Sequence, residues 1–348
     1  MKENTIIPAG YKSILDLFET EKAIRAIKSY FEENLAEALN LRRVTAPLFV
    51  ETGMGINDDL NGSELPVSFK TTGNMQYKVE IVQSLAKWKR MALADYGFGF
   101  NHGEGLYTDM NALRPSEVVD NLHSIYVDQW DWERVVSPAE RNAGFLKDVV
   151  ERIYLVMRRT ERFIYERYLN IKPILPEHIT CIHTEELAER YPDLDPAARE
   201  YQAAKEFGAI FVMGIGADLP DGAPHDGRAP DYDDWTTPGD DGRPGLNGDI
   251  VVWNPVLERQ FELSSMGIRV DPETLLKQLE VRGVGERKEL WWHKRLLAGE
   301  FPLSVGGGIG QSRLCMFFLR KAHIGEVQSS VWPKSMLQEC ADKGVVLL

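Results

Sequence analysis

The stretch Val305-Gly-Gly-Gly-Ile-Gly-Gln-Ser-Arg-Leu-Cys-Met-Phe-Phe-Leu319 joins a glycine-rich, strand-like run to a helix-like run of Leu, Met and Phe. Glycine allows positive φ and lets a ligand approach the backbone closely. The start of a helix offers free N–H groups and a positive dipole end, which suit phosphate. We expect Arg313 in that first turn, paired with phosphate or stacked on a base. The alternative is a tight strand-to-helix corner with a surface arginine, because neither GxGxxG nor GxxxxGK[ST] occurs here.

A hairpin upstream places polar side chains on one face of a predicted strand. Arg114 lies where the first strand enters a loop, and the second strand runs over 123–135. Because side chains alternate across a strand, Gln129, Asp131 and Glu133 share one face. Such a polar face is costly in a core unless it meets a ligand. The alternative is the solvent face of a half-exposed sheet, but the adjacent Arg114 favours a site.

A second hairpin, expected over 249–270, repeats this arrangement. Asp249 and Glu262 are candidate Mg²⁺ ligands, since Mg²⁺ binds few carboxylates together with phosphate oxygens. Arg269 is a candidate for bidentate contact with a carboxylate. The alternative is an ion pair between Glu262 and Arg269 at a sheet edge, and taken alone this hairpin favours that alternative.

Charge and cysteine content narrow the function classes. The 348 residues carry a net charge of −13, which argues against a broad surface for nucleic acid or for anionic membranes. The cysteines, Cys181, Cys315 and Cys340, form no CxxC pair, so neither a disulfide framework nor a thiolate zinc site is expected. The sequence indicates neither a signal peptide nor a membrane span, and a cytoplasmic location is expected.

Long antiparallel hairpins mixed with helices predict an α+β fold. Thr20 is the expected cap of the first helix, and Pro47 places its strand at an edge or interface. Helices are expected over 21–39, 84–95, 139–169, 272–281 and 286–298. Strands are expected over 41–50, 105–113, 123–135 and 209–215, with a hairpin over 66–82. The Gly- and Pro-rich segment 218–248 is expected to be a functional loop or a linker.

Three of these segments resemble the signatures of class II aminoacyl-tRNA synthetases. They are the strand Val44–Pro47, Arg114 with the strand 127–133, and the glycine run 306–313. Longer strings make the chain similar to the ammonia-dependent asparagine synthetase (aspartate–ammonia ligase) family. These strings are 59–62, 84–90, 103–108, 126–133, 228–235, 246–250 and 261–269.

The resemblance implies a fold like a class II synthetase catalytic core, with a mixed, mainly antiparallel sheet flanked by helices. It implies a single catalytic domain over 1–348, in which 1–20 and 339–348 are the least similar parts. It also implies a homodimer formed through the Pro47 strand.

The resemblance also implies an activity and a set of site residues. The family makes L-asparagine from L-aspartate, ATP and ammonia through a β-aspartyl adenylate, releasing AMP and pyrophosphate. Residues expected to bind ATP are Arg114, His123, Glu262 and Arg313, with Mg²⁺ held by Asp249 and Glu262. Residues expected around aspartate are Ser84, Lys89, Gln129, Asp131, Arg228, Ser265 and Arg269. The residues expected to act in catalysis are Arg114, Gln129 and Arg313, with Asp59 and Asp233 as candidates for binding and deprotonating ammonium.

Within this expectation Asp131 takes the substrate α-amino group, whereas the choice of cation for each carboxylate stays open. Lys2 follows Met1, and the first cysteine is Cys181. An N-terminal cysteine nucleophile for glutamine is therefore missing, and free ammonia is the expected nitrogen source. Two alternatives remain: a truncated aspartyl-tRNA synthetase-like enzyme with another acceptor, and a non-catalytic sensor of aspartate or AMP.

Overall fold

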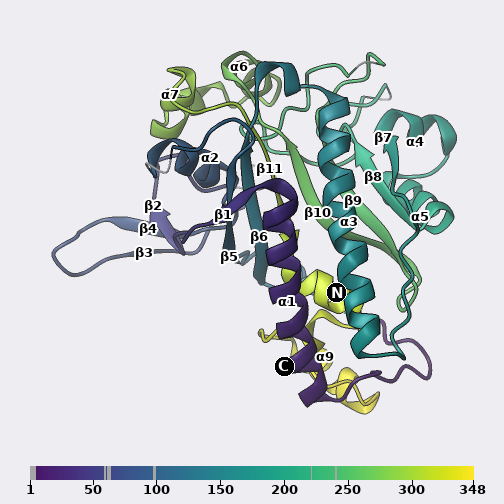
Figure 1. Ribbon diagram of the computed structural model, residues 1–348. Helices are drawn as coiled ribbons and strands as arrows, with labels where there is room; N and C mark the ends of the chain where they lie inside the picture. The colour runs from purple at the N-terminus through teal and green to yellow at the C-terminus, as the bar shows by residue number, and fades with distance from the viewer. Residues whose placement is uncertain (1–4, 59, 61–63, 97–98, 221, 240) are drawn as a thin grey trace.

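The structure is a computed structural model that describes residues 5–58, 60, 64–96, 99–220, 222–239 and 241–348. An eight-stranded sheet runs through the centre of the molecule in the order β1-β5-β6-β11-β10-β9-β8-β7 (Figure 1). β1 pairs with β5 and β7 with β8 in parallel, and the other neighbouring pairs of this sheet are antiparallel. The predicted mixed, mainly antiparallel α+β fold is confirmed. The strands are β1 (Leu41–Arg43), β5 (Gly105–Leu113), β6 (Tyr126–Val135), β7 (Thr180–His183), β8 (Ala209–Met213), β9 (Asn247–Asn254), β10 (Arg259–Ile268) and β11 (Ser304–Gly310).

Two long helices, α1 (Leu17–Leu39) and α3 (Ala143–Arg167), cover one face of this sheet (Figure 1). Trp130 of β6 packs on Phe31 of α1, with ring centroids 4.7 Å apart. The predicted cap Thr20 is wrong: Asp16 caps α1 by accepting a hydrogen bond from the backbone of Glu19. The helix therefore begins one turn earlier than its apolar spacing indicates.

The remaining helices surround the other face and the ends of the sheet (Figure 1). They are α2 (Ala86–Asp95), α4 (Thr184–Arg190), α5 (Pro196–Phe207), α6 (Pro272–Val281), α7 (Trp291–Leu297), α8 (Gln311–Phe318) and α9 (Lys334–Asp342). Short 3₁₀ helices are η1 (Pro138–Glu140), η2 (Gly285–Glu289) and η3 (Ile324–Glu326). In the part of the chain that the structure describes, none of the helices is long and apolar enough to cross a bilayer.

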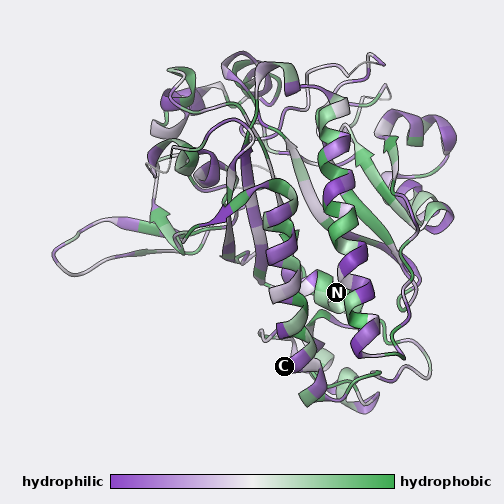
Figure 2. Ribbon diagram, in the orientation of Figure 1, coloured by the Kyte–Doolittle hydropathy of each residue, from purple (hydrophilic) through white to green (hydrophobic). Residues whose placement is uncertain are grey.

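The predicted strand 41–50 is divided on either side of Pro47. β1 forms one edge of the large sheet, whereas β2 (Phe49–Glu51) forms an edge of a small sheet with the order β2-β4-β3. The expected edge position is confirmed. The hairpin of β3 (Ser68–Lys70) and β4 (Lys78–Ile81) projects from the body of the molecule as an arm (Figures 1 and 2).

Candidate active site

A cavity of about 400 Å³ opens on the sheet face opposite α1 and α3. Its walls come from β6, β10, β11, the start of α2 and the loops around residues 114–124 and 226–233. β11 brings these distant segments together, because Gly308 lies opposite Asp131 of β6 on one side and Ser265 of β10 on the other. Strand pairing therefore places the polar faces of both predicted hairpins in one site.

The glycine run forms a central strand instead of a left-handed turn. Gly306, Gly307, Gly308 and Gly310 all have ordinary extended φ angles, so the expectation of positive φ is wrong. A Cβ on Gly306 would lie 1.9 Å from Glu133 Oε2, and one on Gly308 would lie 2.5 Å from an oxygen of the Gln129 amide. The missing side chains give the polar groups of β6 room to lie across β11.

Lys89 and Asp131 form a buried pair at one end of the cavity. The ammonium group of Lys89 pairs with Asp131 Oδ1 and donates to the Gly307 carbonyl at 2.7 Å. Burial lowers the pKa of Lys89, and the Asp131 carboxylate opposes this change. Asp131 Oδ2 is also buried, and it has no hydrogen-bond partner among the described residues. A carboxylate oxygen in this state is a natural acceptor for a substrate ammonium group.

Arg269 is held between two acidic residues. Its Nε and Nη2 donate to Glu133 at 3.0 and 2.8 Å, and its Nη1 pairs with Asp233. The alternative ion pair between Glu262 and Arg269 is wrong, because Glu262 instead pairs with Arg313 at 3.3 Å. Seven residues along a strand separate two side chains by about 23 Å, which puts Glu262 and Arg269 at opposite ends of the cavity.

Arg228 enters the cavity from the loop after β8. Its Nη2 pairs with Asp249 at 2.6 Å and its Nη1 donates to Ser265 Oγ at 2.6 Å. Burial and the nearby Glu262 carboxylate together raise the pKa of Asp249 to about 7, although the Arg228 guanidinium opposes this change. Of the two predicted metal ligands, Glu262 lines the cavity, whereas Asp249 is not among the described lining residues.

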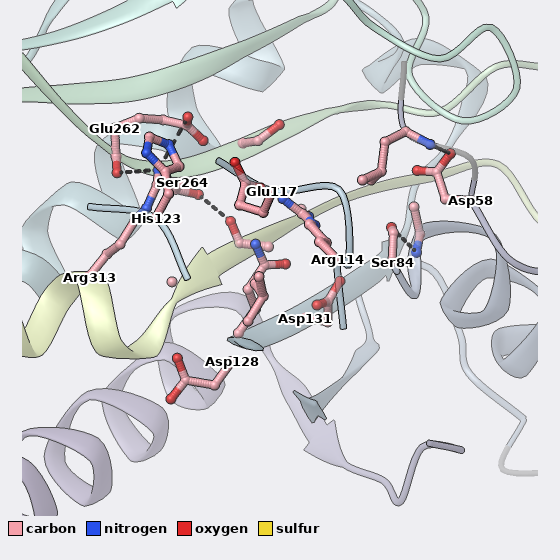
Figure 3. Close-up of a pocket in the computed structure, with 18 of the residues that line it drawn as sticks. Asp58, Ser84, Arg114, Glu117, His123, Asp128, Asp131, Glu262, Ser264 and Arg313 are labelled. Atoms are coloured by element: carbon pink, nitrogen blue, oxygen red, sulfur yellow. Dashed lines mark hydrogen bonds and ion pairs between the residues drawn. The ribbon is translucent and has the colours of Figure 1, made fainter. Parts of the chain in front are cut away.

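The other end of the cavity holds more exposed cations. Figure 3 shows Arg313, His123 and Glu262 gathered there, with Arg114 towards the middle. Arg313 lies in the first turn of α8, as expected, and its Nη1 donates to the Glu262 carbonyl at 3.0 Å. His123 bonds to Asp120 at 2.9 Å. Arg114 Nε is buried without a hydrogen-bond partner among the described residues.

Asp59 and Asp233, the two candidates for ammonium binding, differ in what the structure shows of them. Asp59 lies outside the described residues. Asp233 lines the cavity, but its oxygens face Arg269 and, at 3.6 Å, Arg228 Nε. Asp58 is buried and also lines the cavity, at the end where Ser84 lies (Figure 3). The sequence pattern pointed to the neighbouring Asp59, because the Asp58-Asp59 pair alone does not show which of the two carboxylates faces the cavity.

The predicted site residues are otherwise brought together. The cavity is lined by Ser84, Lys89, Arg114, His123, Gln129, Asp131, Arg228, Asp233, Glu262, Ser265, Arg269 and Arg313. It is also lined by residues that the sequence pattern did not single out, among them Asp58, Glu64, Tyr232, Ser264, Ser312 and Gln328. Most of these lie next to a predicted residue, so a search for polar neighbours would have found them.

Comparisons with known proteins give a family and a fold. A family model described as aspartate-ammonia ligase matches residues 18–344. A protein of Parabacteroides distasonis named aspartate–ammonia ligase is 58% identical over 343 residues, which cover 99% of both chains. One of Clostridium perfringens with the same name is 55% identical over 346 residues, covering 99% of this chain and all of the relative.

Solved structures with a similar fold are tRNA synthetases. Asparaginyl-tRNA synthetase of Entamoeba histolytica with asparaginyl-adenylate superposes with a TM-score of 0.62 at 16% identity. The enzyme of Pyrococcus horikoshii, also with asparaginyl-adenylate, superposes with a TM-score of 0.61 at 16% identity. The match covers 90% of this chain and 66% and 70% of those chains, so this chain spans about two thirds of their length. This likeness confirms the class II synthetase core fold.

Proposed function

The chain belongs to the aspartate–ammonia ligase family, and we propose from its pocket how it carries out the reaction of that family. The reaction joins L-aspartate to ammonia with ATP. The β-carboxylate attacks the α-phosphorus, giving β-aspartyl adenylate and pyrophosphate. Ammonia then attacks the acyl carbon, the carbon–oxygen bond to AMP breaks, and L-asparagine is released after loss of a proton. The protein supplies mainly positioning and charge stabilisation.

Aspartate binds at the buried end of the cavity. Asp131 Oδ2 accepts the substrate α-ammonium group, and its lack of another partner is the single observation that best supports this end as the amino-acid site. Lys89, Arg228 and Arg269 each keep N–H groups beyond those used within the protein, and these bind the two carboxylates. Ser84 and Gln129 add hydrogen bonds from the cavity wall.

ATP binds at the more exposed end, with its α-phosphate next to the aspartate site. Arg114 lies between the two ends (Figure 3) and holds the α-phosphate as negative charge develops there. Arg313 contacts the γ-phosphate or the adenine face, and releases Glu262 as it does so. His123 contributes a further hydrogen bond. Its position near Glu262 and Arg313 in the cavity wall (Figure 3) supports this role.

Glu262 and Asp249 are the residues that would hold Mg²⁺. They lie on paired strands, close enough for one carboxylate to raise the pKa of the other, which suits a shared cation. No group of three or more acidic, His or Cys ligands occurs in the described part of the chain, so phosphate oxygens must complete the shell. A bound Mg²⁺ would offset phosphate charge, and we expect it to bind with ATP and not before.

Ammonium binds near Asp58 or Asp59 and gives up a proton there before attack. Asp58 is buried in the wall of the cavity at the aspartate end, which supports this segment over Asp233. Asp233, held between Arg228 and Arg269, instead orients these two cations.

We also propose a cytoplasmic homodimer that contacts its partner next to Pro47. Leu48 and Phe49 follow this proline and are about half exposed, as are Phe69 and Tyr77 on the arm. Exposed apolar side chains grouped in this way are typical of interfaces. Light scattering should show a dimer for the wild-type protein and a monomer for Phe49→Asp combined with Phe69→Asp. A wild-type monomer would contradict the proposal.

A product assay tests the function. Purified protein with ATP, Mg²⁺, L-aspartate and ammonium, without tRNA, should give asparagine, AMP and pyrophosphate in equal amounts. Aspartate-dependent exchange of pyrophosphate into ATP without asparagine would indicate another acceptor, such as tRNA. Nucleotide binding with neither product nor exchange would indicate a sensor.

A further inference from the structure

A buried ionic network lies outside the cavity described above. It joins Lys87 of α2, Asp231 of the loop after β8 and His293 of α7, all of them buried. Asp231 Oδ2 accepts from Lys87 Nζ at 3.0 Å and from His293 Nε2 at 3.0 Å, and Arg287 Nη1 lies 3.6 Å away. The proposed reaction uses none of these groups. A buried carboxylate with several cationic or polar partners is expensive to desolvate, so its retention needs a reason.

Two of the network residues lie two positions before residues of the proposed aspartate end. Lys87 lies two positions before Lys89 on α2, and residues two apart on a helix point in very different directions. Asp231 lies two positions before Asp233, which lines the cavity. The contact between Lys87 and Asp231 therefore joins two walls of the cavity from behind.

Helix α7 connects a third segment of the cavity wall, around residues 54–58, to this arrangement. Trp292 N donates to Met54 O at 3.0 Å, and Trp292 Nε1 donates to Lys87 O at 2.8 Å. The His293 ring lies so close to Gly55 that a Cβ there would be 2.9 Å from its Nδ1. Asp58, three residues after Gly55, lines the cavity. Trp292 and His293 thus contact all three segments that form the aspartate end.

We propose that His293 is a positioning residue that sets the spacing of the aspartate end through Asp231. The proposal rests on the proposed function. In the tautomer with the proton on Nε2, the His293 ring donates to Asp231 and Nδ1 is an acceptor, so no buried N–H of the ring lacks a partner. Without this donor, the Asp231 carboxylate keeps Lys87 and Arg287 as its side-chain partners among the described residues. The loop that carries Asp233 is still bonded to Gln278 of α6, but it loses one of its links to the α2 side of the cavity, where Lys89 lies.

Aspartate-dependent exchange of pyrophosphate into ATP tests this role in the full-length protein. His293→Ala should raise KM for aspartate about tenfold or more while KM for ATP stays within about twofold. His293→Gln should recover most of the loss, because its amide Nε2 can donate to Asp231. Asp231→Asn keeps the volume of the side chain and should behave like His293→Ala. If the alanine variant does not fold, KM for aspartate and KM for ATP are compared in Asp231→Asn instead.

The control is Glu161→Gln on α3, on the opposite face of the sheet. Glu161 forms a buried pair with Arg320 at 2.8 Å, so this variant should lower Tm without changing KM for aspartate. An equal rise in both KM values, an unchanged KM for aspartate in His293→Ala and Asp231→Asn, or no rescue by His293→Gln would overturn the proposal. Absence of exchange in the wild-type protein would instead remove the proposed function and this inference with it.

Discussion

The two ends of the cavity differ in how their charges are held. At the proposed aspartate end, Lys89, Asp131, Glu133 and Arg269 are at most 3% exposed, and each is bound to an opposite charge. At the nucleotide end, the side chains of Arg313 and Glu262 are 22% and 47% exposed, and they pair loosely. In the reaction proposed above, a fixed array suits recognition of one small zwitterion through geometry, whereas a more exposed cation suits a flexible triphosphate. Changes at the two ends should therefore have different consequences.

The largest effect is expected for Glu133→Gln, which removes one of the two carboxylates that hold the buried Arg269 and leaves it with Asp233. Breaking one partner of a buried ion pair costs roughly 3–5 kcal/mol of folding free energy, and thermal unfolding should show a clear fall in Tm. Tm within about 1 °C of wild type would mean that the aspartate end is not held by this pair.

The same pair gives a pH dependence. Burial raises the pKa of Glu133, but the Arg269 guanidinium outweighs it and holds this pKa below its usual range. Stability contributed by Glu133 is therefore complete above the ordinary glutamate pKa of about 4.3 and is lost as the pH falls below it. The difference in Tm between wild type and Glu133→Gln should stay constant from pH 8 to pH 5 and narrow at lower pH.

Asp131→Asn should have the next largest effect, now on activity. Loss of the charge that binds the substrate ammonium should lower kcat/KM for aspartate roughly 10²–10³-fold, as for other buried charge pairs. KM for ATP should change little, because Asp131 faces the amino-acid end. Asp109→Asn on the neighbouring strand is the control, since Asp109 pairs with the exposed Arg43. A large rise in KM for ATP in Asp131→Asn would contradict the division into two ends.

Arg313→Ala should act only on the nucleotide end. Because Arg313 is partly solvated, we expect a fall in kcat/KM for ATP of about 10- to 100-fold with an unchanged Tm, and partial activity in Arg313→Lys. The rate of pyrophosphate exchange, measured for wild type and variant at the same ATP concentrations, checks this. Exchange at the wild-type rate by Arg313→Ala would contradict the proposed role of Arg313 in ATP binding.

The smallest effect is expected from salt. Raising ionic strength from about 0.05 to 0.2 M shortens the Debye length and weakens exposed charge interactions more than buried ones. KM for ATP should rise roughly threefold. KM for aspartate should change by less than about 1.5-fold. An equal salt dependence would show that both ends are solvated alike.

The sequence predicted most of what lies within single segments. The polar face of β6, the strand-to-helix junction at Arg313 and the hairpins all follow from local periodicity, and the structure confirms them. The resemblance to synthetase signatures predicted the lining residues. Both kinds of inference depend on patterns short enough to be visible in one window.

Pairings between distant segments were not predictable in this way. Glu133 and Arg269 are 136 residues apart, and only the insertion of β11 between β6 and β10 brings them together. Their closeness in sequence favoured an ion pair between Glu262 and Arg269. In the structure, seven residues of extended chain place their side chains about 23 Å apart. The network of Lys87, Asp231 and His293 was also missed. Its members have no motif spacing, and they meet only where α2, α7 and the loop after β8 come together in the fold.

The position of β11 also bears on the order in which the protein folds. β6 and β10 are synthesised before β11, yet in the large sheet they are joined only through it. A strand of glycines has little intrinsic tendency to form and depends on its neighbours. The two halves of the sheet, β1-β5-β6 and β10-β9-β8-β7, are therefore expected to assemble separately and to close late, at a step with a high loop-closure entropy. On the ribosome, the catalytic pocket would come into existence only after residue 310 has left the exit tunnel.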